Sequence, residues 1–262
     1  MHTPGVYSAQ KKDGSTYYRA SITFRMKHIS LGSFPTSELA GRAYRGALLL
    51  LGDASLSLEN YHESYALPFE KWVSLTNFRD NGLYIAKPIY IRIKYFDYYY
   101  APDIVLKFDL DDLFYYSSHK IMKRGNRFFV ADYGMQMGIA SRYGIKNYAV
   151  CGRDYRFVNG DSLDFRYENI EIKNRFHGVT QLIGRKAGSY QAKIHVNGYF
   201  VIGYYNTETE AAIAYNKAID ILKKAGVKKQ YVPNYLESIS PALYADLYNT
   251  ISISKAILNY RP

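Results

Sequence analysis

The sequence is poor in the residues that build covalent or metal-held scaffolds. It contains a single cysteine, Cys151, which excludes an internal disulfide framework and a cysteine-based zinc site. We expect this thiol to be a small buried apolar residue, the usual environment of an unpaired cysteine. No run of about 18 apolar residues is present, and the N-terminus lacks the pattern of a signal peptide. We therefore expect a cytoplasmic protein with no membrane partner.

The residues that are abundant predict a folded chain. Of 262 residues 48% are hydrophobic and 16% aromatic, enough to bury a real core. This length suggests about two domains, with three small ones as the alternative.

Positive charge is concentrated in two separate blocks. The net charge of +11 divides into +5 for residues 1–52, 0 for 53–174, +6 for 175–230 and 0 for 231–262. Two basic segments around a neutral one indicate two sites for a polyanion, because a generally basic chain would spread its charge.

The first basic block has the pattern of a small sheet followed by a helix. An alternating run over residues 18–24 predicts a half-buried strand, and a further strand covers residues 28–32. Thr36 or Ser37 can cap a helix that runs to about Leu51.

The second basic block, residues 178–225, repeats this plan. Both copies contain a Gly-Val pair, a Tyr-x-Ala-x-Ile strand and an Ala-x-x-x-Tyr helix. The opening glycine and the last strand glycine lie 27 positions apart in the first copy, Gly5 to Gly32, and 25 positions apart in the second, Gly178 to Gly203. Thr207 and Glu210 form a capping box before the second helix. The agreement indicates an internal repeat.

Both copies resemble the plant ethylene-response-factor (APETALA-type) DNA-binding domain and its bacterial relatives in homing nucleases and integrases. The resemblance covers about 48 residues in each copy. It implies a three-stranded antiparallel sheet packed on one helix, with its other face in the major groove of double-stranded DNA. Tyr18 and Tyr190 stand where many members have tryptophan.

The side chains that alternate away from the helix are the candidate DNA contacts, because arginine favours guanine, glutamine favours adenine and lysine binds phosphate. On the sheet faces these are Arg19, Ser21, Thr23 and His28, with Gln191, Lys193, His195 and Tyr199 in the second copy. At hairpin ends, where phosphate contacts are expected, they are Lys11, Lys12, Lys27, Arg185 and Lys186. For any single residue the alternative is an ordinary solvated sheet face.

Residues 108–174 resemble the HNH nuclease family of phage and intron homing enzymes. The framework of the family's core motif is present in Asn159, Gly160, Asp161, Asp164, Arg166 and Asn169. In this family a histidine is the general base and the aspartate before it a metal ligand. Phe157 and Arg156 stand at those two positions here.

Those replacements predict an inactive nuclease. Hydrolysing a phosphodiester needs a base for the attacking water and a divalent cation on the phosphate. Phe157 cannot accept a proton, and Arg156 would repel the cation. We therefore expect no catalytic residue, no metal and no cofactor.

The expected architecture is α+β. APETALA-type domains at residues 1–54 and 175–262 flank a degenerate HNH-like domain at 55–174, in which residues 60–110 are expected to be rich in strands. The C-terminal domain ends in a helical tail, around Leu243 and Ile257, that either covers the middle domain or mediates a homodimer.

Three functions follow from these patterns. The first is a noncatalytic, sequence-selective DNA-binding protein, a transcriptional regulator of bacterial, phage or mobile-element origin. The second is an active metal-dependent HNH homing-type endonuclease, with a shifted metal site that uses Asp154, Asp161 or Asp164 with His177. The third is a sensor or interaction protein whose tyrosine-rich middle binds a small-molecule or protein effector. No nucleotide-binding loop supports the third.

Overall fold

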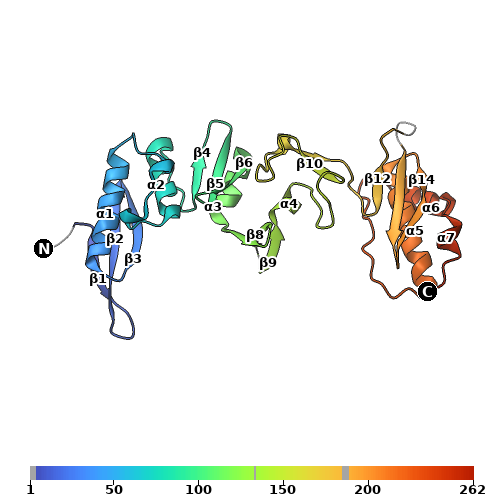
Figure 1. Cartoon of the computed structure of the whole chain (residues 1–262), viewed down its shortest axis with the longest axis horizontal. Coiled ribbons are helices and arrows are strands. Elements are labelled where there is room, and N and C mark those ends of the chain that lie inside the picture. The colour runs from blue at the N-terminus through green and yellow to red at the C-terminus, as the bar shows by residue number, and fades with distance from the viewer. Residues whose placement is uncertain (1–3, 133, 185–188) are drawn as a thin grey trace. The chain divides into compact units, whose positions relative to one another are not determined.

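The computed structural model describes residues 4–132, 134–184 and 189–262 (Figure 1). Its fold class is α+β, as the sequence predicts: within the described residues, short helices accompany four three-stranded antiparallel sheets and one two-stranded sheet. The chain forms two compact units, Met1–Ile139 with Asp161–Tyr167 and Ala140–Gly160 with Glu168–Pro262. The three-domain division expected from the sequence stays a prediction.

The first sheet has the order β1-β2-β3 and packs on one helix. It comprises β1 (Val6–Gln10), β2 (Thr16–Phe24), β3 (Lys27–Phe34) and α1 (Ser37–Gly52). The alternation of β2 and β3 buries one row of apolar side chains against small residues of α1, among them Ala40, Ala43 and Ala47. Thr36 caps the helix as predicted, since its Oγ1 accepts a hydrogen bond from the Leu39 backbone NH at 3.2 Å.

The second sheet has the order β12-β13-β14 and packs on α5 (Figure 1). Its elements are β12 (Val179–Gln181), β13 (Tyr190–His195), β14 (Tyr199–Tyr205) and α5 (Glu208–Lys224). The predicted capping box is confirmed, because the Thr207 side chain accepts from the Glu210 backbone NH while the Glu210 carboxylate accepts from that of Thr207.

The two sheets share an irregularity of register. A bulge falls between Ala20 and Ser21 in the first sheet and between Ala192 and Lys193 in the second. In each sheet the NH after the bulge donates to the carbonyl of the glycine before the first strand, at 2.9 Å from Ser21 to Gly5 and 2.7 Å from Lys193 to Gly178.

Residues 60–110 were expected to be rich in strands. This expectation is wrong for Phe69–Asn81, which form the helix α2. Pro68 precedes this helix, and Gly82 ends it with φ of 73°. The buried Trp72 of α2 donates through Nε1 to the carbonyl of Ser57. The 3-10 helices η1 (Leu58–Asn60) and η2 (Glu63–Tyr65) lie between α1 and α2.

Apolar and polar residues alternate from Ile89 to Tyr95, a pattern typical of a strand, but this run is not one strand. It divides into β4 (Ile89–Ile91) and the start of β5 (Tyr95–Ala101), and the Arg92 backbone NH donates to the Tyr95 carbonyl across the turn. With β6 (Ile104–Asp109) these strands form a sheet of order β4-β5-β6. Its aromatics pack in a core, where Phe108 stacks on Tyr116 at 4.1 Å between ring centroids.

Short elements complete the middle of the chain. Two short helices, η3 and α3, follow the β4-β5-β6 sheet, and a hairpin turn at Gly125 joins β7 to β8. The elements are η3 (Leu110–Asp112), α3 (Leu113–Ser118), β7 (Ile121–Arg124), β8 (Arg127–Asp132), β9 (Met135–Gly138), α4 (Ile139–Arg142), β10 (Tyr155–Phe157), η4 (Tyr167–Asn169) and β11 (Ile170–Ile172).

The tail forms α6 (Pro241–Thr250) and α7 (Lys255–Leu258). Its buried Ile251, Ile253 and Ile257 belong to the core of α5 and the second sheet, a role that the sequence did not indicate. The homodimer stays a prediction. Within the described residues, no helix is both long and apolar enough to cross a membrane.

The expectation for Cys151 is wrong, because its thiol is exposed. It forms an isolated β-bridge with Tyr155, directly before the turn at residues 152–154.

Candidate nucleic-acid interface

The outer face of the first sheet presents polar side chains in cross-strand rows. Arg19 lies opposite Tyr7 and Ser33, Ser21 opposite Ser30, and Thr23 opposite His28. Arg19, Thr23 and His28 are exposed and Ser21 is half-buried. The face therefore carries a cation surrounded by hydroxyl and imidazole groups, all able to donate to phosphates or base edges.

Arg19 is held in one orientation on this face. Its Nη2 donates to the Tyr17 hydroxyl at 2.7 Å, and its Cζ lies 5.4 Å from the centre of the Tyr17 ring. This contact leaves other guanidinium hydrogens for a ligand, because arginine has five N–H donors. An arginine whose side chain is already held in one orientation loses less conformational entropy on binding a ligand than a freely rotating one.

The lysines expected at hairpin ends occupy different environments. Lys11 and Lys12 are exposed in the turn between β1 and β2. At the other hairpin, the Lys27 ammonium lies 5.2 Å from the centre of the Tyr84 ring. Beside it, Arg25 donates to the Phe78 carbonyl at 3.1 Å. The β2–β3 turn is thus tied to α2, whereas the β1–β2 turn is free to meet a partner.

The outer face of the second sheet is built around Lys193, His195 and Tyr199. Lys193 and His195 are exposed on β13, and Tyr199, opposite His195, is 78% exposed. The rings of His195 and Tyr199 meet edge to face at 4.9 Å. This face combines a cation with aromatic and imidazole groups.

Gln191 does not present a free amide on that face. It is buried, and its Nε2 donates to the Tyr204 hydroxyl at 2.9 Å. Its cross-strand neighbours Thr180 and Tyr204 flank it on both sides. The alternation predicts the face correctly, but the neighbouring side chains cover Gln191, so reading of adenine by this amide is not supported.

Lys229 is a basic residue of this surface that the sequence patterns did not single out. Its Nζ lies 3.0 Å from His195 Nδ1 and donates to the His195 carbonyl at 2.9 Å. The available signal was the basic block itself, which runs to residue 230, but a contact across 34 residues leaves no local pattern. The predicted contacts Arg185 and Lys186 lie outside the described residues.

The framework residues of the nuclease-like motif have structural partners. Asp164 is buried and accepts from Arg166, whose Nη2 lies 2.6 Å from Oδ2. Asp161 accepts from the Leu163 backbone NH at 3.0 Å and from Lys107 Nζ at 3.0 Å. Their contacts are those of turn-forming and ion-pairing carboxylates.

The two replaced positions lie on β10. Arg156 pairs with Glu171 on β11, and Phe157 is half-buried with its ring 5.7 Å from that of Tyr155, edge to face. Phe157 thus makes an aromatic packing contact, although it is not fully enclosed in a core.

Of the two residues named for a shifted metal site, Asp154 is buried and His177 is half-buried with its Nδ1 atom enclosed. Burial raises the pKa of Asp154, but hydrogen bonds from Arg153 and the Val150 NH outweigh it and hold that pKa below its ordinary value. Burial lowers the pKa of His177, and the Arg153 charge adds to this effect. In the described part of the chain, no three His, Cys, Asp or Glu side chains are grouped to hold a metal ion.

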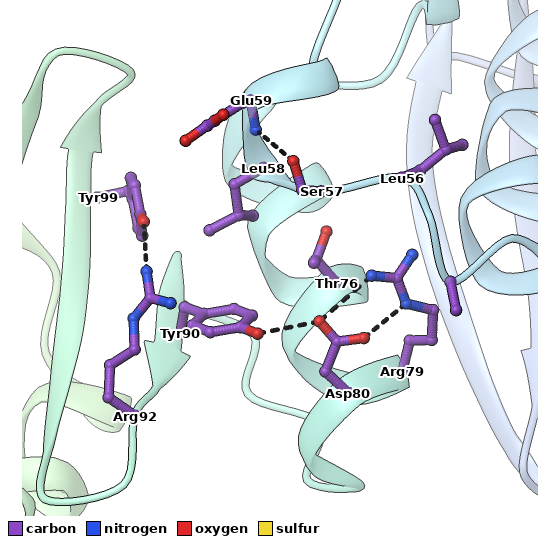
Figure 2. Close-up of a pocket in the computed structure, with 11 residues that line it drawn as sticks. Leu56, Ser57, Leu58, Glu59, Thr76, Arg79, Asp80, Tyr90, Arg92 and Tyr99 are labelled. Carbon is purple, nitrogen blue, oxygen red and sulfur yellow. Dashed lines mark hydrogen bonds and ion pairs between the residues drawn. The ribbon is translucent and has the colours of Figure 1, made fainter.

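A pocket of about 230 Å³ lies between η1, α2 and the β4–β5 hairpin (Figure 2). Tyr90 and Tyr99 line it, and the Tyr90 hydroxyl donates to Asp80 at 3.0 Å. Arg92 lies 4.4 Å from the centre of the Tyr90 ring and pairs with Asp97. Burial lowers the pKa of Arg92, but its hydrogen bond to Asp97 and the nearby negative charge, chiefly that of the Asp97 carboxylate, together raise that pKa above its ordinary value. The polar groups of the pocket are thus used within the protein.

Comparison with protein-family models, with curated proteins and with solved structures finds no match for this chain. The resemblances to APETALA-type domains and to HNH nucleases therefore stay expectations from the sequence, and function is inferred from the geometry described above.

Proposed function

We propose that this chain is a noncatalytic protein that binds double-stranded DNA sequence-selectively through the outer faces of its two sheets. The observation that carries the proposal is the pair of sheets, each packed by one face on a helix and each presenting an exposed cation among polar side chains on the other. Arg19 is held by Tyr17 in the first, and Lys193 lies beside His195 in the second. Both sheets belong to the two blocks that hold the chain's entire positive excess.

Two unlike faces in one chain suit a composite site. The first presents Arg19 with hydroxyl groups and the second Lys193 with His195 and Tyr199, so the two faces would prefer different bases. Binding through one face raises the effective concentration of the other at its own half-site, which strengthens binding without any new contact. Such a protein would act as a regulator of transcription in a bacterium, phage or mobile element.

The partners of the motif residues support a noncatalytic role. Asp164 is bound to Arg166, Asp161 to Lys107 and Arg156 to Glu171. The position of the family's general base is held by Phe157, which cannot take a proton from water.

The pocket in Figure 2 favours a second candidate, an effector site in the middle of the chain. It fits the expectation of a tyrosine-lined ligand site, because Tyr90 and Tyr99 line it. Its volume of about 230 Å³ is small beside ligand sites of about 300–1,000 Å³. We therefore rank this candidate below DNA binding.

Selection of bound DNA from a random double-stranded pool tests the proposal. Wild type is compared with Arg19→Gln and with Lys193→Gln, and Arg45→Gln, an exposed residue on the outer side of α1, is the control. We expect two sequence blocks, each weakened by the change on its own sheet and both kept in the control. A pool without enrichment, or blocks that ignore both sheet variants, would overturn the proposal.

Nicking of supercoiled plasmid with Mg²⁺ or Mn²⁺ tests the noncatalytic part separately. We expect none. Nicking that Asp161→Ala abolishes and Arg19→Ala leaves intact would establish the endonuclease instead.

A further inference from the structure

The neutral middle of the chain contains one strongly basic element. Residues 53–174 have no net charge, yet residues 119–131 contain four cations and no carboxylate. These residues form most of the β7–β8 hairpin, and the cations are Lys120, Lys123, Arg124 and Arg127. The sum over the segment hides this local excess.

Many other cations of the middle are neutralised by a partner. Arg79 pairs with Asp80 at 2.7 Å, Arg92 with Asp97 at 2.7 Å and Arg166 with Asp164 at 2.6 Å; Lys107, Arg153 and Arg156 are paired in the same way. In contrast, no carboxylate within the described residues pairs with Lys123, Arg124 or Arg127, and all three are exposed. Their charge is available to an outside partner.

The hairpin places two of these charges directly opposite each other. Arg124 and Arg127 are cross-strand partners on either side of the turn at Gly125, whose φ is 57°. Like charges at opposite positions of a sheet destabilise it. Among the described residues no carboxylate lies between the two guanidinium groups, and a polyanion that binds both would relieve their repulsion.

Aromatic rings support the same cations. The Lys123 ammonium lies 5.3 Å from the centre of the Phe128 ring, and the Arg124 guanidinium lies 5.6 Å from that of Phe129. The rings favour extended side chains along the hairpin, because a cation is attracted to an aromatic face. Lys123 lies on one face of the hairpin and the Arg124–Arg127 pair on the other, so the cations surround the tip, where a phosphate backbone can contact them.

We propose that the tip of the β7–β8 hairpin, formed by Lys123, Arg124 and Arg127, binds phosphates of the same DNA duplex as the two sheets. This inference rests on the proposed function, and it gives the middle of the chain a role in binding beyond that of a spacer. Phosphate contacts carry no sequence information, so the hairpin adds affinity and salt dependence and leaves sequence preference to the sheets.

The test measures affinity for selected DNA against salt concentration, with the full chain throughout. The hairpin variant is Lys123→Gln/Arg124→Gln/Arg127→Gln, which keeps much of each side-chain stem. The control, Lys94→Gln/Lys146→Gln/Lys223→Gln, removes the same charge from exposed positions elsewhere. Circular dichroism of both variants verifies that the fold is kept.

We expect the hairpin variant to reduce the slope of log affinity against log salt by about 2–3, since each lost phosphate contact removes about 0.9. The control should change the slope by less than one contact, and both should select the same sequence. An unchanged slope in the hairpin variant, or an equal loss in the control, overturns the hairpin proposal and leaves DNA binding by the sheets intact. A wild-type slope near zero would overturn both proposals.

Discussion

The ring of Tyr44 lies directly over Gly5, with no room for a side chain between them. A β-carbon at Gly5 would overlap Cδ2 and Cε2 of that ring and approach the Ser21 carbonyl. Gly178 meets Tyr215 and the Lys193 carbonyl in the same way. Two residues that begin and end the repeated pattern in the sequence are thus in contact, and each contact joins the first strand to the helix behind its sheet.

Replacing Gly5 with alanine should unfold the first unit more easily. The residue has φ of 71°, which costs a non-glycine residue about 1–2 kcal/mol, and the overlap with Tyr44 adds about 1–3 kcal/mol. We expect the free energy of unfolding to fall by about 2–5 kcal/mol, the sum of these two costs. Urea unfolding followed by the fluorescence of Trp72, the single tryptophan, measures this loss. The control is Gly14→Ala, which has φ of 83° but nothing within 4 Å of the added carbon. Equal losses in both variants would show that backbone strain alone matters and that the ring contact does not.

The two aspartates of the nuclease-like motif should differ in their effect on stability. Asp164 is fully buried with Arg166 on its carboxylate, so Asp164→Asn removes the negative charge that faces this largely enclosed guanidinium and should cost about 3 kcal/mol. The pair of Asp161 with Lys107 is about one-third exposed on both sides, so Asp161→Asn should cost about 0–1 kcal/mol. Trp72 fluorescence in urea reports both. A larger loss at Asp161 would contradict a structural role for Asp164.

His177 should make the second unit sensitive to acid. Its buried Nδ1 has no hydrogen-bond partner in the described residues, and its pKa lies below the ordinary value of 6.5. Because the unfolded chain takes up the proton near pH 6.5 and the folded chain resists it, the stability from neutral His177 is complete above pH 6.5. It declines as the pH falls through the interval down to the lowered pKa.

Urea unfolding followed by circular dichroism at pH 7.5 and pH 5.5 measures this effect. His177→Phe keeps a ring between Tyr148 and Tyr215 and should lose part of the difference in midpoint between the two pH values. The exposed His62→Gln should retain the full difference. If His177→Phe retains it as well, the acid sensitivity comes from other groups.

The two sheet-helix units could be predicted from sequence because their signals are local. Alternation places Ala20 and Ile22 on the buried face, and the threonine at each helix start fixes where the helix begins. Helix α2 was missed because residues 72–78 are all buried, so no polar stripe marks a period of 3.6. Only the flanking Pro68 and Gly82 indicate it.

The sequence could predict which side chains point to the outer face of each sheet. It could not predict which of those side chains are accessible to a partner. Period-two alternation assigns Gln191 to the outer face, but the ring of Tyr204 from the next strand covers it. The contact of Lys229 with His195 joins residues that are 34 positions apart. The positive charge of the β7–β8 hairpin is not visible in the net charge of the middle segment, because acidic residues elsewhere in that segment balance it. Each of these features depends on which residues the fold brings together.

Gln191 and Lys193 are two positions apart on β13, yet we expect their replacement to have different effects. Replacing Gln191 should lower stability, and replacing Lys193 should weaken DNA binding. Gln191→Ala leaves the Tyr204 hydroxyl without this donor and opens space under it, so we expect a loss of about 1–2 kcal/mol in stability and an unchanged sequence preference in DNA selection.

Lys193→Gln should leave stability within about 0.5 kcal/mol of wild type, because the residue is exposed. It should weaken DNA binding and lower the salt slope by about 1 if its contact is to phosphate. Urea unfolding and binding titrations on the same two proteins provide both measurements. A change of sequence preference in Gln191→Ala would show that its amide is released to read a base when DNA binds, which its burial under Tyr204 argues against.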